Sequence, residues 1–253
     1  MKARFGKRSG RGLHDRFVLI AVLVGASLLT ITISLTAPAQ QTVFNVPTTD
    51  VLDKGQVYFE LDVSAKPTDS QAVNKFSSFV PRLVIGANHQ IEAGVNLLGN
   101  IQPGPDATII SPTIKWKAYD GKQNGWAVAL GNNLFIPIHN RQYDAGTYSY
   151  LMTQKAFNQS TRIGFGSYFF SKNVVAPNAN RAGGQFTFEQ PLNKKVTFAA
   201  DWFTGKHSAG YFSPGVILKA GPKITAYATY TIGNQNAASG NHFFLLEFGY
   251  NFN

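Results

Sequence analysis

Few residues of this chain have the types and spacing that catalysis needs, and the pair His207 and Ser208 is the first to consider. A serine nucleophile needs a histidine base within hydrogen-bond reach. Neighbouring residues of a strand point to opposite faces, so these two side chains would diverge there. We therefore interpret them as polar loop residues. His242 has no matching serine on an apolar strand face, and we interpret it as a rim residue.

Metal and cofactor chemistry also lack the residues they need. His139, His207 and His242 fall in three separate segments without H-x-H or H-x₃-H spacing. The chain has no cysteine, which excludes thiolate catalysis, disulfides and Cys-ligated zinc. It also has no glycine motif for phosphate or dinucleotide binding. The sequence thus predicts no catalytic residue, no metal, no cofactor and a protein that is not an enzyme.

The composition differs from that of a soluble domain. Charged residues make up 14% of the 253 residues, while there are 20 Phe, 10 Tyr and 24 Gly. A typical soluble domain carries about a quarter charged residues. The mean hydropathy of −0.09 is too low for a bundle of membrane helices. Strands that alternate apolar and polar residues in a membrane would give this combination.

The positive charge and a leader sequence coincide at the N-terminus. The net charge is +10, but residues 1–39 hold six of the 23 basic residues and one of the 13 acidic ones. No basic run lies beyond them, so we expect no nucleic-acid partner. Basic residues 1–16, the apolar run 17–35 and Ala37-Pro38-Ala39 predict a cleaved signal peptide over residues 1–39. The alternative is a retained anchor, because the run could span a bilayer.

The rest of the chain has the periodicity of β-strands. Residues 40–55 show no period, and we predict a periplasmic N-terminal lead-in there. From Gln56 the period is two: in residues 57–63 (VYFELDV) the odd-numbered positions are apolar, with Glu60 and Asp62 on the other face. Similar segments occur at residues 56–63, 76–88, 90–100, 110–119, 125–135, 147–156, 161–170, 183–190, 195–204, 210–219, 223–232 and 242–252.

The connections between these segments alternate between long and short almost throughout; only residues 205–209 weaken the contrast. Membrane barrels have short periplasmic turns and longer outer loops. The sequence therefore predicts an all-β fold, a transmembrane antiparallel up-and-down β-barrel of about 12 strands over residues 56–253. Proline in a closed sheet marks a bulge, so Pro81, Pro112 and Pro214 predict bulges near the rim.

The final segment predicts how the barrel reaches its membrane. Phe248, Tyr250 and Phe252 continue an apolar and aromatic face to the C-terminus. They resemble the C-terminal signal that barrel-assembly machinery recognises, although the last residue is Asn253. We expect a protein of the cell outer membrane, with that machinery and outer-membrane lipid as partners.

Charged residues on the polar strand faces would line the lumen. These candidates are Glu60, Asp62, Arg82, Glu92, Lys115, Lys117, Lys155, Arg162, Glu189, Asp201, Lys219 and Glu247. The sign of the charge alternates along the first four segments, which predicts cross-strand ion pairs. Two hypotheses remain open: a charged constriction that sets the selectivity of a pore, and a structural network that fills the lumen.

Three segments together resemble a family of outer-membrane transporters named for the meta-cleavage pathway of phenol degradation. They are VPTTDVLDKGQVYFE (residues 46–60), RLVIGANHQIEAGVNL (82–97) and ISPTIKWK (110–117). The resemblance extends over most of the chain beyond the leader. It implies a channel or uptake role for small solutes, aromatic ones among them, and transfers no individual site residue.

The sequence supports one main functional hypothesis and two alternatives. The main hypothesis is a narrow passive channel or uptake pore for small solutes with a charged lumen. The first alternative is a structural or surface-interaction barrel with a closed lumen. The second, an outer-membrane lipid hydrolase, lacks the serine and histidine pair described above.

Overall fold

The computed structural model describes residues 41–66, 76–98, 108–139, 144–157, 161–234 and 242–252. The predicted leader and Asn253 lie outside these ranges. The described chain forms twelve strands and one short 3-10 helix, η1 (Lys122–Asn124). Within the described residues, no helix is long and apolar enough to cross a membrane.

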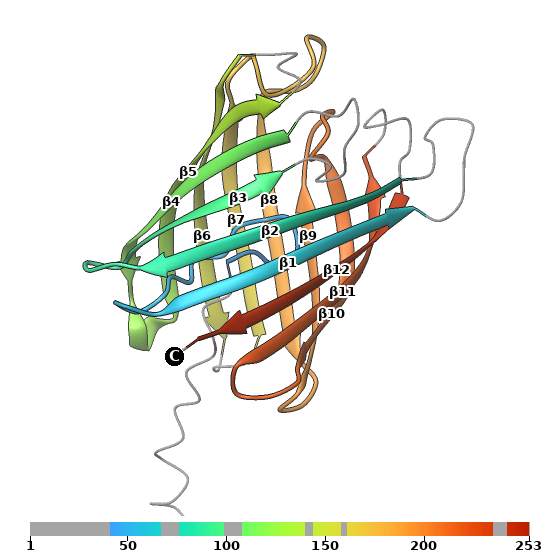
Figure 1. Cartoon of the computed structure of the whole chain (residues 1–253). Helices are drawn as coiled ribbons and strands as arrows, with labels where there is room; N and C mark the ends of the chain where they lie inside the picture. Colours follow the sequence, from blue (N-terminus) through green and yellow to red (C-terminus); the bar gives the residue numbers. More distant parts are fainter. Residues whose placement is uncertain are drawn as a thin grey trace, which may run out of the picture. The chain divides into compact units, whose positions relative to one another are not determined.

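The strands close into one antiparallel barrel in which each strand pairs with its neighbours in sequence and β1 pairs with β12 (Figure 1). The strands are β1 (Val57–Lys66), β2 (Phe76–Gly86), β3 (Ile91–Leu98), β4 (Thr108–Asp120), β5 (Trp126–His139), β6 (Gly146–Phe157), β7 (Thr161–Phe170), β8 (Ala182–Pro191), β9 (Val196–Phe203), β10 (Tyr211–Lys219), β11 (Ile224–Gly233) and β12 (His242–Asn251). This confirms the predicted fold class and strand number.

Alternation along the strands gives the barrel two different faces. On β12, for example, Phe244, Leu246 and Phe248 are exposed on the outside, while Leu245 and Glu247 are buried inside. Successive side chains of a strand point to opposite faces, so one sequence period produces both surfaces. The barrel therefore has a mostly apolar outer wall and a lumen that holds most of the charged residues of the strands.

The two ends of the barrel differ in the lengths of their connections. At the end where β1 begins and β12 ends, the strands are joined over residues 87–90, 121–125, 158–160, 192–195 and 220–223. At the other end, every interval between consecutive strands is longer. The segment 204–210, which weakened the contrast in sequence, follows the rule once the strand ends are known. We call these the short-turn end and the long-loop end.

The predicted bulges at proline are wrong. Pro81 and Pro112 pair in unshifted register with Leu61 and Val95, and no register shift occurs at Pro214. The two register irregularities lie between β4 and β5, at Thr108/Ile109 and Lys117/Tyr119. A proline removes one ladder hydrogen bond, and the strands keep their register at these positions without it.

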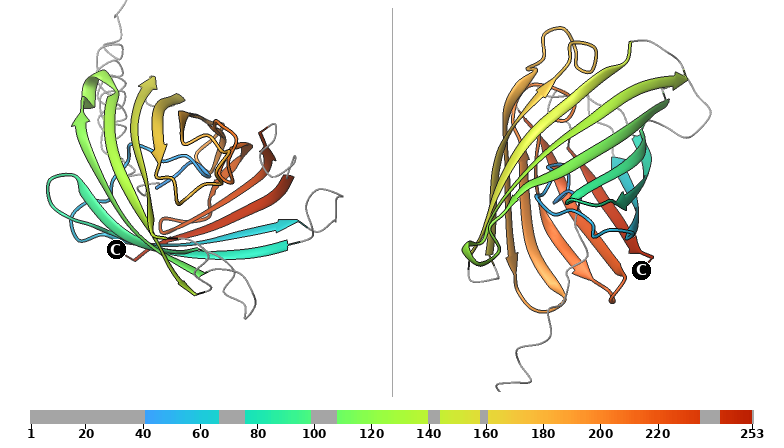
Figure 2. Two further views of the ribbon diagram at one scale, coloured as in Figure 1. Left: turned by 90° about the horizontal axis from the view of Figure 1, so that it is seen from above. Right: turned by 90° about the vertical axis from the view of Figure 1, so that its left-hand side faces the viewer.

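Residues 41–52 lie inside the barrel rather than ahead of it, and Asp53 to Gly55 are exposed where the chain turns into β1 (Figure 2). The chain forms a hairpin, with a bridge between Thr42 and Pro47 and a hydrogen bond from Val43 N to Val46 O of 2.9 Å. Gly55, with a φ of +80°, turns the chain into β1, and its N–H donates to Gly86 O at 2.9 Å. We call residues 41–55 the lumen hairpin.

Candidate functional site

Eleven of the twelve charged residues predicted for the lumen lie on the inner face of the wall. They are Glu60, Asp62, Arg82, Glu92, Lys115, Lys117, Arg162, Glu189, Asp201, Lys219 and Glu247. Each occupies the strand face opposite the exposed apolar side chains. The alternation of side chains along the strands therefore places these charges together in the lumen.

Lys155 is the exception, and its predicted position in the lumen is wrong. It pairs in register with Trp126, an exposed outward residue, so both lie on the outer face. Its Nζ is 5.3 Å from the centroid of the Trp126 ring and donates to Asn124 O. The lumen face of β6 carries Tyr148, Tyr150, Met152 and Gln154 instead.

The predicted cross-strand ion pairs are confirmed for three pairs of neighbouring strands. The distances are 2.7 Å for Arg82 Nη1–Glu60 Oε1, 2.9 Å for Lys115 Nζ–Glu92 Oε1 and 3.6 Å for Arg162 Nε–Glu189 Oε1. In each pair the two residues are direct partners in register. Such positions bring side chains close enough to interact, so the register places the opposite charges in contact.

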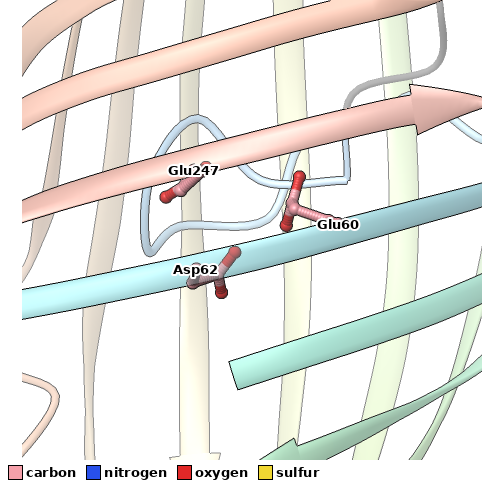
Figure 3. A group of neighbouring side chains, drawn as sticks. All are labelled: Glu60, Asp62 and Glu247. Atoms are coloured by element: carbon pink, nitrogen blue, oxygen red, sulfur yellow. The ribbon is translucent and has the colours of Figure 1, made fainter. Parts of the chain in front are cut away.

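The closure between β1 and β12 instead brings acidic side chains together (Figure 3). Asp62 and Glu247 are direct partners in register, and carboxylate oxygens of Glu60, Asp62 and Glu247 lie within 4.8 Å of one another. Arg82 pairs with Glu60 and, at 3.4 Å, with Asp62. Glu247 is 1% exposed, and neither of its carboxylate oxygens has a hydrogen-bond partner among the described residues.

A carboxylate on the opposite wall holds the tip of the lumen hairpin. Asp201 Oδ2 accepts hydrogen bonds from the backbone N–H groups of Phe44, Asn45 and Val46 at 3.0, 2.5 and 2.7 Å. Consecutive backbone N–H groups in a turn form a concave site for an anion. Asn45 Nδ2 also donates to Ser213 Oγ at 2.9 Å. The tip therefore binds a buried side chain of β9, a contact between residues far apart in sequence.

Three further polar contacts hold the base of the hairpin near the short-turn end. Glu92 Oε2 accepts from Gln41 Nε2 at 2.8 Å and from Leu52 N at 2.9 Å. Asp50 pairs with Arg162 at 2.7 Å. Burial alone would raise the pKa of Asp50, but the positive charges of Arg162, Lys117 and Lys115 and the hydrogen bond from Arg162 together outweigh burial and lower the pKa. The Asp50 carboxylate therefore stays ionised at neutral pH.

The lumen hairpin also completes the apolar packing inside the barrel. Each of the three buried apolar clusters contains one or more of its residues. Val43 and Phe44 pack with residues of β9 to β12, Val46 packs with aromatic residues of β6, β7 and β9, and Leu52 packs with Tyr58 and Val84. The lumen hairpin thus packs against the inner face of the wall in all three clusters.

An aromatic cluster lies in the lumen towards the long-loop end. It consists of Tyr148, Tyr150, Tyr168, Phe170 and Phe203. The rings of Tyr168 and Phe203 have centroids 4.5 Å apart. His207 Nε2 lies 2.8 Å from Tyr168 Oη. Burial lowers the pKa of His207, so its ring is neutral at pH 7.

Three cavities lie beside the part of the wall formed by β2 to β7. One of about 210 Å³ at the long-loop end is lined by Phe135, Phe170 and Val174, and is largely apolar. One of about 100 Å³ lies beside the hairpin, between Asn45, Arg82 and Lys115. One of about 170 Å³ at the short-turn end is lined by charged residues that include Asp50, Lys117 and Arg162. Each has room for several water molecules.

The candidate catalytic and metal-binding histidines do not form a site among the described side chains. His207 is buried, and Ser208 beside it is exposed. His242 is exposed at the start of β12, with its ring 6.2 Å from that of Tyr230. The side chain of His139 lies outside the described residues. Among those described, the one group whose geometry could hold a metal is the acidic group of Glu60, Asp62 and Glu247.

Sequence reasoning missed the role of the lumen hairpin. The segment has no strand period and no catalytic motif, so it was interpreted as a lead-in. Its composition did carry a signal, because Val43, Phe44, Val46, Val51 and Leu52 make it too apolar for a solvated linker. A segment with few charges and several buried-type residues needs an apolar surface to cover.

No protein-family model matches the sequence, and no curated protein matches it. Solved structures show the likeness of fold. An outer membrane channel from Pseudomonas putida F1 is 11% identical, with a TM-score of 0.54, and the match covers 80% of this chain and 97% of that chain. The fold is therefore that of an outer-membrane β-barrel.

Two further matches are more distant. Outer membrane phospholipase A from Escherichia coli, as an active-site mutant, is 13% identical with a TM-score of 0.46, covering 80% of this chain and 91% of that chain. The toluene transporter from Ralstonia pickettii is 9% identical with a TM-score of 0.45, covering 80% and 90%. At these values the matches transfer no activity and no site residue to this chain.

Proposed function

We propose that this protein is a narrow outer-membrane channel or uptake pore for small solutes, with a charged lumen. The observation that carries the proposal is the set of three cavities beside β2 to β7, one at the long-loop end, one beside the lumen hairpin and one at the short-turn end. The middle cavity, beside the hairpin, is the smallest. The hairpin thus acts as the constriction, and only small solutes pass it.

The lining of the cavities suggests what the passage selects. Arg82, Glu92 and Lys115 line the constriction, and Lys115 is paired with Glu92. Lys117 and Arg162 stand at the short-turn end, where Asp120 and Asp50 balance them in part. Charged side chains along a narrow pore set ion selectivity. Lys117 is the best residue to probe, because it is less buried than Lys115.

The outer wall supports a membrane location. Exposed aromatic and aliphatic side chains cover it, including Trp116, Trp126 and Trp202. In this proposal the leader, residues 1–39, exports the chain. Barrel-assembly machinery then recognises Phe248, Tyr250 and Phe252, whose side chains are exposed on or just beyond β12. The short-turn end faces the periplasm and the long-loop end faces outwards.

Single-channel recording in planar lipid bilayers tests the proposal. We expect a small, steady conductance from the purified protein, and Lys117→Glu should shift the reversal potential in a salt gradient towards cation selectivity. Lys155→Glu is the matched control, because Lys155 lies on the outer wall and should leave the reversal potential unchanged. Equal effects of both substitutions, or none from Lys117→Glu, would contradict a role for Lys117 in the passage.

The same hairpin favours a second candidate, a barrel with a closed lumen. Its tip and base both bind the wall, and its apolar residues complete the core. A closed barrel predicts no conductance from the native protein at any voltage. Conductance from the native protein supports the channel and excludes the closed barrel.

A further inference from the structure

The outer face of β6 differs in chemistry from the rest of the wall. Its outward residues alternate with the buried lumen residues Tyr148, Tyr150, Met152 and Gln154. The six outward residues are Thr147, Ser149, Leu151, Thr153, Lys155 and Phe157. All of them except Leu151 and Phe157 are polar or charged. On β1, β10 and β11, the outward residues of the described strands are apolar or aromatic throughout. The outward residues of β12 are also apolar or aromatic, except for His242 at its start.

Polar side chains on the two neighbouring strands extend this face. Asn132 on β5 is the register partner of Ser149, and its Nδ2 donates to Ser149 Oγ at 2.7 Å. Ser167 on β7 is the register partner of Leu151. We call Asn132, Thr147, Ser149, Thr153 and Ser167 the outer polar patch. Exposed apolar residues flank it along the strands: Leu130 and Leu134 around Asn132, and Phe165 and Phe169 around Ser167.

The flanking residues place Asn132, Ser149 and Ser167 within the apolar part of the wall rather than at its rim, and Thr147 lies nearer the long-loop end. Lipid chains offer no hydrogen-bond partner, so polar side chains there are costly unless another protein group meets them. Interfaces between transmembrane helices use small and polar side chains such as Ser, Thr and Asn for this reason, and the same side chains can act in this way on a barrel wall. The bond to Ser149 uses one N–H of the Asn132 amide, which has a second N–H and a carbonyl oxygen.

We propose that the outer polar patch is a docking surface for a second copy of this chain. The proposal rests on the outer wall lying in lipid, as the proposed function requires. The patch favours a second copy because its amide and hydroxyl groups each donate and accept hydrogen bonds. Such a surface complements itself when two copies are related by a two-fold axis, which is the commonest symmetry of protein dimers. Two serines in the patch also let the walls approach closely.

Cross-linking in vesicles tests the docking surface, and the absence of native cysteine makes it clean. Leu151→Cys places a thiol in the patch, and Leu246→Cys is the matched control on β12, six strands away around the barrel. The two leucines are 42% and 41% exposed. With a short bismaleimide cross-linker, we expect covalent dimers from Leu151→Cys well above the level from Leu246→Cys. Equal dimer yields from both variants would overturn the proposal.

A second substitution tests the polar groups themselves. Asn132→Leu in the Leu151→Cys chain should weaken association about three- to tenfold, because one hydrogen bond in a membrane contributes roughly 0.6–1.4 kcal/mol. An unchanged yield of dimers would show that the polar groups do not drive association, against the proposal. Measuring this yield across a series of protein-to-lipid ratios separates affinity from random collision.

Tryptophan fluorescence distinguishes failure of this proposal from failure of the proposed function. The three tryptophans of the chain all lie on the outer wall, so brominated lipids should quench them if the wall contacts lipid. Strong quenching without dimers at Leu151→Cys leaves the membrane barrel intact and overturns the dimer. Absent quenching in a folded barrel overturns the lipid-facing wall, and the docking surface with it.

Discussion

Glu60 and Glu247 are buried carboxylates on neighbouring strands, but their surroundings differ. Glu60 receives hydrogen bonds from Tyr58 Oη at 2.5 Å and from Arg82 Nη1 at 2.7 Å. Glu247 faces Asp62 across the closure of the barrel and has no basic partner among the described residues. A buried charge is costly unless it is paired. Replacing each carboxylate by a neutral amide should therefore affect the stability of the barrel differently at the two positions.

We expect Glu60→Gln to destabilise the barrel by about 3 kcal/mol, because it leaves the Arg82 guanidinium with a weaker partner. Glu247→Gln should be neutral or stabilising, since it removes one of two like charges that face each other. Urea unfolding in detergent micelles measures both, with Asp120→Asn at the short-turn end as a surface control. An equal loss of stability in both variants would contradict this assignment.

At the residue scale, the sequence predicted that neighbouring strands form ion pairs, but it did not predict the surroundings of every charged side chain. Alternating charge signs on successive segments predicted ion pairs between neighbouring strands, but not that Glu60 would pair with Arg82 and Glu92 with Lys115. The assignment failed at Lys155, because it assumed that charged residues lie on the lumen face, whereas β6 also carries polar and charged residues on its outer face. The isolation of Glu247 depends on how the barrel closes, which no local pattern contains.

At the scale of elements, strands and hairpin differ in how far the sequence specifies them. Each strand is set by its own period of two, so residues 161–170 were predicted with the bounds that β7 has. The lumen hairpin has no such period. Its shape depends on a partner more than 150 residues away in the chain, since Asp201 binds the N–H groups of residues 44–46. Local sequence cannot specify a contact of that kind.

We expect Asp201→Asn to loosen the hairpin tip while leaving the strands intact. Hydrogen bonds to a charged acceptor are worth roughly 1.5–3 kcal/mol each, and a neutral amide weakens them. A loss of about 1.4 kcal/mol makes the released tip about tenfold more populated. Hydrogen–deuterium exchange should therefore speed up at Phe44, Asn45 and Val46.

Asp120→Asn is again the control, because its side chain does not contact the tip. Exchange within the β9 and β10 ladder should stay the same in both variants, which shows that the wall remains folded. Unchanged exchange at Phe44–Val46 in Asp201→Asn would mean that apolar packing of Val43, Phe44 and Val46 alone holds the hairpin.

At the scale of the whole molecule, the lengths of the connections define a direction. Every interval at the long-loop end is longer than any at the short-turn end, and the lumen hairpin leads into β1 from the short-turn end. A soluble sheet has no reason to sort its connections in this way. A barrel inserted from the periplasm does, because its turns stay on that side and its loops cross to the outside.

Selective labelling in whole cells tests this direction. Lys172→Cys lies at the long-loop end, between β7 and β8, and Lys194→Cys lies at the short-turn end, between β8 and β9; both lysines are exposed. A maleimide that does not cross membranes should label Lys172→Cys in intact cells. It should label Lys194→Cys only after the outer membrane has been permeabilised, because the label must first reach the periplasm. Because the native chain has no cysteine, each signal comes from a single site, and the reverse pattern would require the opposite orientation of the barrel.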